Sequence, residues 1–296
     1  MQVLVTGGAG FIGSNLAARL IRECHRVTII DNLSTGKCKN LHKKAKFFKL
    51  DISNLKAIKS HFKKQDVVFH VAAIPRISRS IENPAETFNS NVTGTLNVLL
   101  AARDAGVKRV VYSASSSAYG IQDKLPLRED MAARPLNPYA LSKYIGEELC
   151  KEFTELYGLD TISLRYFNVY GPRMDIRGEY ATVIGKFLQQ KSQGKPLTIV
   201  GDGRQTRDFT HVSDIVEANV LASEVKNGGG EIINTGGGEN HSVLEIADMI
   251  GGERVHVPER PAEIRDTLAD IAKAKRILGW EPRVGLKEGI AKLLNC

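Results

Sequence analysis

The stretch Thr6-Gly7-Gly8-Ala9-Gly10-Phe11-Ile12-Gly13 directly follows an apolar, strand-like run, Val3–Thr6, and leads into a helical pattern at 12–24. Its glycines match G-x-x-G-x-x-G at 7, 10 and 13, and G-x-G-x-x-G at 8, 10 and 13. A strand-to-helix turn without β-carbons lets a pyrophosphate approach the backbone N–H groups at the positive end of a helix. Glycine-rich turns are common, but a strand before the turn and a helix after it are the context that dinucleotide binding requires.

Short apolar runs alternate with helical patterns through the first 170 residues. Strands are expected at Val3–Thr6, Arg26–Ile30, Lys46–Leu50, Asp66–Val71, Arg109–Ser113 and Thr161–Tyr166, and helices at 12–24, 54–64, 85–105 and 139–157. Several of the strand runs are continuously apolar, which is typical of strands that are buried on both faces. Strand alternating with helix predicts an α/β fold with a doubly wound parallel sheet, of the Rossmann type.

After residue 170 the alternation becomes irregular, and helices are expected at 182–193, 213–225, 242–250 and 286–294. We interpret this part as a smaller C-terminal α/β lobe that binds substrate at the carboxyl ends of the sheet. The predicted division places 1–168 in a dinucleotide-binding Rossmann domain, to which 209–238 returns. The lobe then consists of 169–208 and 239–296.

The composition is that of a globular protein, with 42% hydrophobic and 25% charged residues. No run approaches the roughly 18–20 apolar residues that a membrane span needs, and no secretion signal is visible at the N-terminus. The four cysteines are scattered and none is in a CxxC pair, so neither a disulfide framework nor a zinc site is expected. A reducing, cytoplasmic compartment fits these features best.

The net charge of +8 invites comparison with nucleic-acid-binding proteins, but it is local. Residues 37–64 contain ten lysines and one acid, Asp51, which leaves the remainder of the chain close to neutral. This segment lacks the interleaved aromatic side chains of a single-strand binder, since it contains only Phe47, Phe48 and Phe62. We therefore expect no nucleic-acid partner, and interpret the lysines as a solvated face.

Two carboxylates follow the second and third expected strands. Asp31 lies 18 residues after Gly13, where a carboxylate would accept hydrogen bonds from both ribose hydroxyls of adenosine and repel a 2′-phosphate. NAD is therefore favoured over NADP, although an acid that merely begins a turn is the alternative. Asp51, with Ile52, is placed to meet the adenine edge, but it could equally cap the next helix.

Tyr139 and Lys143 form a Y-x-x-x-K pair, one helical turn apart on one face. The pair follows Ser115, at the end of a predicted strand, by 24 residues. A free tyrosine titrates near pH 10, and a nearby ammonium would favour the phenolate and make it a usable base. Ser115 could hydrogen-bond the same substrate hydroxyl. The alternative is a tyrosine that packs at a helix start and a surface lysine.

At this point the chain resembles the extended short-chain dehydrogenase/reductase superfamily, specifically its nucleotide-sugar 4-epimerases, from Met1 to at least Trp280. The residues that carry the resemblance are the glycine stretch from Val5 to Gly13, Asp31-Asn32, His70-Val71-Ala72-Ala73, Asn91-Val92-Thr93-Gly94-Thr95, Ser115 with Tyr119-Gly120, Pro138-Tyr139-Ala140-Leu141-Ser142-Lys143, Arg165-Tyr166-Phe167-Asn168 and Arg204-Gln205-Thr206-Arg207-Asp208-Phe209.

The resemblance implies an NAD-dependent isomerase with Ser115, Tyr139 and Lys143 as catalytic residues, which inverts C4 of a UDP-sugar through a transient 4-keto sugar and needs no metal. The implied cofactor-binding residues are Gly7, Gly10, Phe11, Ile12, Gly13, Asp31, Asn32, Asp51, Ile52, Val71, Ala72, Ala73, Asn91, Tyr139, Lys143 and Tyr166. Relatives that dehydrate or decarboxylate nucleotide sugars usually carry a carboxylate after the catalytic Ser or Thr, where this chain has Ser116 and Ser117.

The implied substrate-binding residues are Arg79, Ser115, Ser117, Tyr139, Asn168, Val183, Arg207, Arg260 and Thr267. Arg207 and Arg260 would hold the diphosphate, with assistance from Arg265, because the guanidinium fork suits phosphate oxygens. Thr267 stands where the family admits an N-acetyl group when the residue is small. This favours UDP-GlcNAc/UDP-GalNAc, with UDP-Glc/UDP-Gal also accepted. Arg76, with Arg79 close by, departs from the pattern and leaves a UDP-uronic acid as the alternative.

Two further interpretations concern assembly and activity. The family usually forms homodimers through the helices that match 85–105 and 139–157, and Leu96, Leu99 and Leu100 offer apolar surface there, although core packing explains them equally well. A non-catalytic NAD-binding sensor on the same fold is the rival to an enzyme. Such proteins commonly lose the tyrosine or the lysine, and this chain has both.

Overall fold

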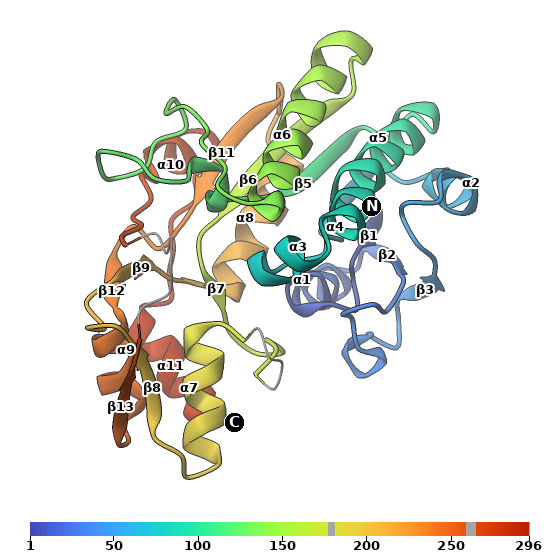
Figure 1. The fold of residues 1–296 in the computed structure, drawn as a ribbon. Coiled ribbons are helices and arrows are strands. Elements are labelled where there is room, and N and C mark those ends of the chain that lie inside the picture. The colour runs from blue at the N-terminus through green and yellow to red at the C-terminus, as the bar shows by residue number, and fades with distance from the viewer. Residues whose placement is uncertain (177–180, 259–264, 296) are drawn as a thin grey trace.

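A seven-stranded parallel sheet is the centre of the computed structural model, which describes residues 1–176, 181–258 and 265–295 (Figure 1). The strand order is β11-β6-β5-β4-β1-β2-β3, and every neighbouring pair is parallel. The order reverses between β1 and β4, which is the point where ligands bind in open α/β sheets.

Six of the seven strands of this sheet agree closely with expected strands, and the seventh, β11, was not among them. The seven strands are β1 (Gln2–Thr6), β2 (Arg26–Asp31), β3 (Lys46–Lys49), β4 (Val67–His70), β5 (Arg109–Ser115), β6 (Asp160–Tyr166) and β11 (Glu231–Thr235). β11 joins the edge beside β6, so the segment 209–238 does contribute to the large sheet. The predicted fold class, a doubly wound parallel sheet, is therefore confirmed.

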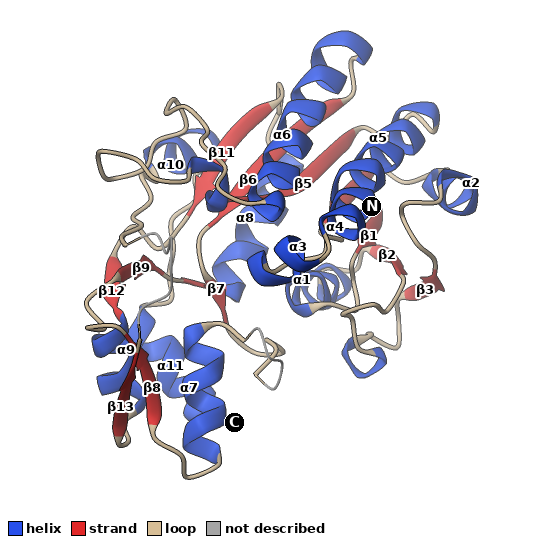
Figure 2. Cartoon of the chain, in the orientation of Figure 1, coloured by secondary structure: helices blue, strands red, loops and turns tan. Residues whose placement is uncertain are grey.

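Helices cover both faces of the sheet, as Figure 2 shows. The helices against one face are α1 (Phe11–Arg22), α8 (Val212–Glu224) and α10 (Ala272–Leu278), and those against the other are α2 (Leu55–Ile58), α5 (Gly94–Asp104) and α6 (Pro138–Tyr157). Successive residues of a strand point to opposite faces. Val3 and Val5 accordingly pack with α1, whereas Leu4 packs with Leu99 of α5. Both faces are buried, which explains the continuous apolar runs.

The expected helix 85–105 is confirmed as one continuous helical stretch, with a π-helical segment inside it. The structure divides it into α4 (Pro84–Phe88), a π-helical segment Asn89–Thr93 and α5. A short helix that the sequence analysis did not expect, α3 (Ile77–Glu82), precedes α4. Single π-helical turns inside α-helices frequently lie at functional sites. Here the π segment contains Asn91, which faces the loop after β4.

The smaller lobe lies beyond the carboxyl ends of the strands (Figure 1). Its elements are α7 (Val183–Ser192), β8 (Leu197–Val200), α9 (Val243–Ile250), β13 (Arg254–Val257) and α11 (Leu286–Leu294). They surround a separate core that includes Ile184, Phe187 and Ile246. Short pairs connect lobe and sheet: β7 (Val169–Tyr170) with β10 (Thr210–His211), and β9 (Thr206–Asp208) with β12 (Asn240–Ser242).

The C-terminal part of the chain contributes to both regions. α10 and Trp280 pack in the core beneath the large sheet, although the expected division assigned all of 239–296 to the lobe. The Trp280 indole donates to the carbonyl oxygen of Asp214, in α8, at 2.8 Å. Among the described residues, no helix is both long and apolar enough to span a bilayer.

Candidate active site

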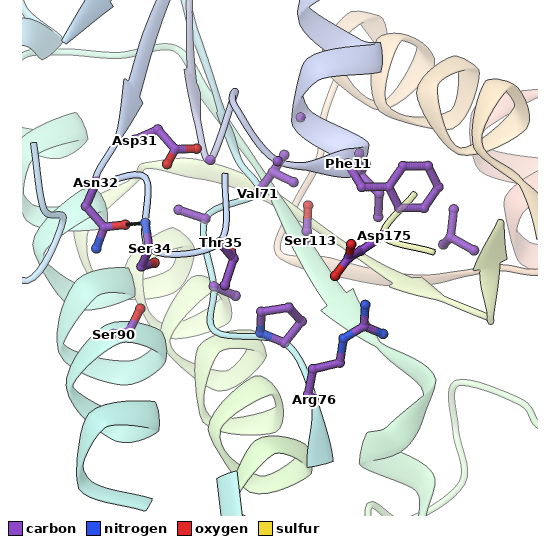
Figure 3. Close-up of a pocket in the computed structure, with 18 of the residues that line it drawn as sticks. Phe11, Asp31, Asn32, Ser34, Thr35, Val71, Arg76, Ser90, Ser113 and Asp175 are labelled. Atoms are coloured by element: carbon purple, nitrogen blue, oxygen red, sulfur yellow. Dashed lines mark hydrogen bonds between the residues drawn. The ribbon is translucent and has the colours of Figure 1, made fainter. Parts of the chain in front are cut away.

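A cavity of about 500 Å³ opens at the reversal of strand order, along the carboxyl ends of β1, β2, β4 and β5 (Figure 3). Its size is within the range of ligand pockets. One end is lined by the glycine turn and Asp31, and the other by Tyr139 and Lys143. The glycine turn and the Tyr–Lys pair, recognised separately in the sequence, therefore border one space.

The glycine turn is shaped by close approach of backbone. Gly7 has φ +73°, and a β-carbon there would lie 2.7 Å from the Ala72 backbone. A β-carbon on Gly13 would collide with the carbonyl oxygen of Gly7. Helix α1 begins after Gly10 without a side-chain cap, so no side chain competes for its first N–H groups. The expected residues Gly7, Gly10, Phe11, Ile12 and Gly13 all line the cavity.

Asp31 is held in place at the end of β2. Its carboxylate accepts hydrogen bonds from the backbone N–H of Ala9 (3.0 Å) and of Leu33 (2.7 Å), and it is buried at the cavity wall. Two constraints from separate loops thus fix the carboxylate at the edge of the glycine turn. That position suits hydrogen bonds to the two hydroxyls of a ribose beside a pyrophosphate. The negative charge of Asp31 would repel a phosphate on either hydroxyl.

Of two expected cofactor residues, Asn32 lines the cavity and Asp51 does not. The Asn32 side chain lines the cavity, accepts from the Ser34 N–H (2.9 Å, Figure 3) and donates to Asp51 (2.8 Å). Asp51 also accepts from the Ser53 N–H at 2.8 Å, and it is not among the residues that line the cavity. Its neighbour Ile52 does line it. The structure therefore connects Asp51 to the cavity through Asn32.

Asn91 was expected among the cofactor residues, yet its amide is engaged within the protein. It accepts from the N–H of Ile74 (2.8 Å) and donates to the carbonyl oxygen of Ile74 (3.1 Å) and to Ser142 (3.0 Å). Asn91 is buried and is not among the residues that line the cavity. It holds the loop that follows β4, whose residues Val71, Ala72 and Ala73 do line the cavity.

Helix α6 positions Tyr139 and Lys143. Asn137 caps it by accepting from the Ala140 N–H (2.9 Å), Pro138 occupies the first helical position, and Gly158 ends it in the left-handed conformation. Both side chains line the cavity, as residues four apart on one helix face should. The Lys143 ammonium donates to the Ser113 carbonyl oxygen at 2.7 Å.

Burial and neighbouring charges shift the pKa values of this pair. Burial raises the pKa of Tyr139, while a hydrogen bond from Ser115 and the positive charge of Arg76 act in the opposite direction. Burial lowers the pKa of Lys143 to about 8, against the attraction of Glu147. A lysine with a lowered pKa beside a buried tyrosine in one cavity is typical of a site for acid–base chemistry.

Ser115 and Ser117 lie at the end of β5 and in the 3-10 turn that follows it. The Ser115 hydroxyl oxygen accepts from the Ser117 N–H (3.2 Å) and hydroxyl (2.9 Å). Neither serine is among the residues that line the cavity, whereas Ser113 does line it. Ser113 also hydrogen-bonds the hydroxyl of Tyr166 (2.9 Å), another expected cofactor residue on the cavity wall.

Three expected substrate residues, Asn168, Arg207 and Thr267, lie around β9 and are not among the residues that line the cavity. Asn168 donates to the Asp208 carbonyl oxygen (2.8 Å), and Thr267 accepts from the Asp208 N–H (3.3 Å). Arg207 donates to the carbonyl oxygen of Arg265 (2.9 Å). Val183 begins α7 and is half-buried. Arg260 lies outside the described residues.

Three cations on the cavity wall have partners on other segments. Lys37 contacts Asp175 at 3.1 Å, across 138 residues of sequence. Arg79 contacts Glu86 of α4 at 2.7 Å. Arg173 donates to a carbonyl oxygen of α1 at 2.8 Å. Lys37, Arg173 and Asp175 were not expected in the site, because they lie on loops without a motif.

Arg79, an expected substrate residue, and Arg76, noted as a departure, both line the cavity. Arg76 and Asp175 are shown together in Figure 3, and the carboxylate of Asp175 acts on the charge of Arg76. Across residues 1–176, 181–258 and 265–295, no group of three or more His, Cys, Asp or Glu side chains is placed to hold a metal ion.

Comparison with known proteins gives a consistent picture. The model of the NAD-dependent epimerase/dehydratase family matches residues 3–236. The UDP-glucose 4-epimerase of Mycolicibacterium smegmatis is 40% identical, with 100% of this chain and 98% of that protein covered. The UDP-glucuronate 4-epimerase of Thermodesulfobacterium geofontis is 38% identical, with 99% and 94% covered.

Solved structures agree with the sequence comparisons. The UDP-glucose 4-epimerase of Thermotoga maritima, crystallised with UDP-glucose, superposes with a TM-score of 0.96 at 37% identity, covering 100% of this chain and 98% of that one. The UDP-N-acetylglucosamine 4-epimerase of Methanobrevibacter ruminantium, in complex with UDP-N-acetylmuramic acid, gives 0.93 at 35% identity, covering 99% and 98%. The chain therefore belongs to the NAD-dependent epimerase/dehydratase family of enzymes, and within it groups with UDP-sugar 4-epimerases, which are isomerases.

Proposed function

We propose that this protein inverts the configuration at C4 of a UDP-sugar, with Tyr139 as the acid–base residue. The observation that carries the proposal is the shared cavity, which the glycine turn and Asp31 border at one end and Tyr139 with Lys143 at the other. A dinucleotide held at the glycine turn and Asp31 would share this cavity with Tyr139 and Lys143. The names of the relatives support the reaction class.

The residues present fit an NAD molecule. The absent β-carbons of Gly7 and Gly13 leave the backbone of the turn open to a pyrophosphate, at the uncapped start of α1. The carboxylate of Asp31 suits the adenosine ribose and disfavours a 2′-phosphate. When bound, NAD⁺ would supply a reversible two-electron oxidant for C4. Asn32, Ile52, Ala72 and Tyr166 would line its remaining surface.

Tyr139 would take the proton of the sugar 4-hydroxyl as C4 is oxidised, and return it after the 4-keto sugar has turned over. Lys143, which lies four residues further along the same helix and lines the same cavity, would favour the phenolate through its positive charge. Ser115 supports the same state, because its hydrogen bond opposes the effect of burial on the pKa of Tyr139. Ser115 would also bind the 4-hydroxyl, since its oxygen accepts and donates.

The positions after Ser115 favour simple epimerisation. Elimination or decarboxylation in the wider family relies on a carboxylate next to the catalytic Ser or Thr. Here the Ser117 hydroxyl donates to Ser115 at 2.9 Å, and Ser116 is the other neighbour. Neither hydroxyl can serve as a carboxylate base at neutral pH.

The substrate sugar is the finer part of the proposal. Thr267, the basis for preferring UDP-GlcNAc/UDP-GalNAc, is bonded to the backbone of Asp208 and is not among the residues that line the cavity. UDP-Glc/UDP-Gal therefore stays an equal candidate among neutral sugars. Arg76, which favours a UDP-uronic acid, does line the cavity. The position of Arg76 in the cavity wall therefore supports the alternative substrate, a UDP-uronic acid, beyond what the sequence did.

The test is to incubate the NAD-loaded protein separately with UDP-GlcNAc, UDP-Glc and UDP-GlcA and to identify the products by NMR. We expect the C4 epimer of at least one. Tyr139→Phe should lower kcat by about 100-fold or more, the contribution typical of a general acid–base group. Tyr144→Phe, on the same helix and not among the cavity-lining residues, is the matched control and should stay near the wild-type rate.

Full activity of Tyr139→Phe would contradict the assigned role. If the wild type turns over none of the three sugars but its bound NAD changes absorbance when a UDP-sugar is added, the non-catalytic sensor gains support instead. We also propose a homodimer in a cytoplasmic setting, in line with the family resemblance.

A further inference from the structure

Among the described residues, five cationic side chains line the cavity: Lys37, Arg76, Arg79, Lys143 and Arg173. Four of them have the partners described above, which are two carboxylates and two backbone carbonyl oxygens. Arg76 is the fifth. Within the described part of the chain, no hydrogen bond or ion pair holds its guanidinium. Its donors are therefore available to a ligand.

Arg76 is built into the wall of the cavity. It precedes α3 with φ 102°, a backbone conformation that residues with a β-carbon seldom adopt and that clusters at functional sites. Figure 3 shows its side chain extending from the loop after β4 toward Asp175. Burial lowers the pKa of Arg76, while Asp175 and Tyr139 act in the opposite direction. The charge therefore sits in a poorly solvated place close to Tyr139.

A partly buried cation without a hydrogen-bonded partner loses part of its hydration, and a ligand anion can offset that cost. The half-exposed carboxylate of Asp175 meets the need only partly, because it contacts Lys37 at 3.1 Å. The diphosphate of NAD belongs at the start of α1, by the argument above. By the family resemblance, the UDP diphosphate is expected at Arg207, in β9, and at Arg260, which lies outside the described residues. The anion nearest to Tyr139 would consequently be on the sugar itself.

We propose that Arg76 binds a carboxylate carried by the sugar ring, and so makes this chain select UDP-uronic acids over neutral UDP-sugars. The inference rests on the proposed 4-epimerase function and names its substrate class. A guanidinium fork matches a carboxylate with two parallel hydrogen bonds, which a neutral hydroxymethyl group cannot replace. A neutral sugar would leave Arg76 desolvated and unpaired.

The test measures affinity in the NAD-loaded Tyr139→Phe protein, so that turnover and the charge state of Tyr139 do not enter. Calorimetric titrations use UDP-glucuronate, UDP-glucose, UDP-N-acetylglucosamine and UDP. We expect UDP-glucuronate to bind at least tenfold more tightly than UDP-glucose. Adding Arg76→Gln should weaken UDP-glucuronate binding by about 10- to 100-fold, as for a lost charge-assisted pair, and change UDP-glucose and UDP by less than twofold.

Two further variants test whether the effect depends on the guanidinium of Arg76. Arg76→Lys keeps the charge without the fork and should recover part of the affinity for UDP-glucuronate. Arg128→Gln removes an exposed arginine that pairs with Asp130, and should leave all four affinities unchanged. Thermal unfolding of each variant checks that the loop before α3 still folds.

Three outcomes would overturn the proposal. They are equal affinity for UDP-glucuronate and UDP-glucose, no effect of Arg76→Gln, or equal loss for all four ligands, which would assign Arg76 to the diphosphate. The wild-type turnover assay separates these failures from failure of the function. Epimerisation of neutral sugars alone would leave the enzyme activity standing and refute selection by Arg76.

Discussion

The ability of Tyr139 to act as a base depends on the groups around its hydroxyl. Burial alone raises the pKa of its hydroxyl, which works against a base at neutral pH. The positive charge of Arg76 opposes this effect, and in the proposed reaction Lys143, whose own pKa burial lowers to about 8, would add a second positive charge. The Lys143 ammonium donates a hydrogen bond to the Ser113 carbonyl oxygen at 2.7 Å, and this contact holds it beside β5.

Replacing Lys143 should therefore produce a pH-dependent defect. Below pH 8 the wild-type ammonium is protonated and favours the phenolate, whereas above pH 8 that charge is lost. Lys143→Met should lower kcat about 100-fold at pH 6.5, and the deficit should shrink as pH rises through 8 to 9.5. The measurement is kcat against pH for both proteins.

Lys151→Met provides the control, because Lys151 lies on the same helix but is exposed and contacts only Glu155 in an i,i+4 pair. Its pH profile should coincide with that of the wild type. A Lys143→Met deficit that is constant at every pH would assign this lysine a structural role.

At the scale of elements, α6 carries the reactive pair because it is anchored at several points. Asn137 and Gly158 define its two ends. In its middle, Glu147 forms a buried ion pair with Arg165 of β6, with a Nη2–Oε2 distance of 2.7 Å. These contacts connect α6 to β6, which lies next to β5. Ser113 belongs to β5, and Ser115 is its last residue. The distance between Tyr139 and the serines is thus set by packing between elements.

Two of the ten lysines in the segment 37–64 lie on an edge strand, where their charge has a structural role. β3, with the sequence Lys46-Phe47-Phe48-Lys49, is the edge strand of the large sheet, and both lysines are exposed. Edge strands present unpaired N–H and C=O groups that can recruit other chains, and lysines there oppose such pairing. The positive charge at this edge consequently protects the fold from association.

Substituting both lysines of β3 should expose this liability. Lys46→Val with Lys49→Val should aggregate at lower concentration and temperature than the wild type, as followed by light scattering. Lys56→Val with Lys63→Val removes the same charge from exposed positions outside a strand and should remain soluble. Equal aggregation of the two double variants would show that net charge, and not the edge, is protective.

At the scale of the whole molecule, the reversal of strand order and the lobe create the site together. The cavity wall combines the ends of four strands with Val169, Arg173, Asp175 and Thr182, which connect the sheet to α7. Leu99, one of three leucines considered for a dimer surface, is fully buried, and Leu96 and Leu100 pack against the same core. The exposed apolar side chains of α6 are Leu141, which is 38% exposed, and Leu156 and Tyr157 at the other end of the helix.

We expect a homodimer that uses the outer face of α6. Light scattering after gel filtration should give a mass about twice the 32.5 kDa of one chain. Leu141→Glu places a charge on this face and should shift the protein toward monomer at micromolar concentration. Ile121→Glu, at an exposed position outside the helices, should not. A wild-type monomer, or a dimer indifferent to Leu141→Glu, would rule out this surface.

The sequence by itself determined six strands of the large sheet and the main helices between them, but not α3, the π-helical segment or β11. The turn from Thr6 to Gly13, the cap at Asn137 and the four-residue step from Tyr139 to Lys143 are local features, governed by backbone geometry and helix periodicity. Parallel strands were predicted because continuous apolar runs alternate with helices. These signals lie within a few residues of one another, so no long-range contact was needed to recognise them.

Tertiary structure alone decided which side chains share the cavity. Asn91 is turned to the Ile74 backbone, Asp51 to Asn32, and Thr267 to Asp208, although motif positions had assigned all three to ligands. Lys37 meets Asp175 across 138 residues, which no local pattern can encode. Loop side chains take the partners that packing brings near them, and their position therefore follows from the whole fold and not from neighbouring sequence.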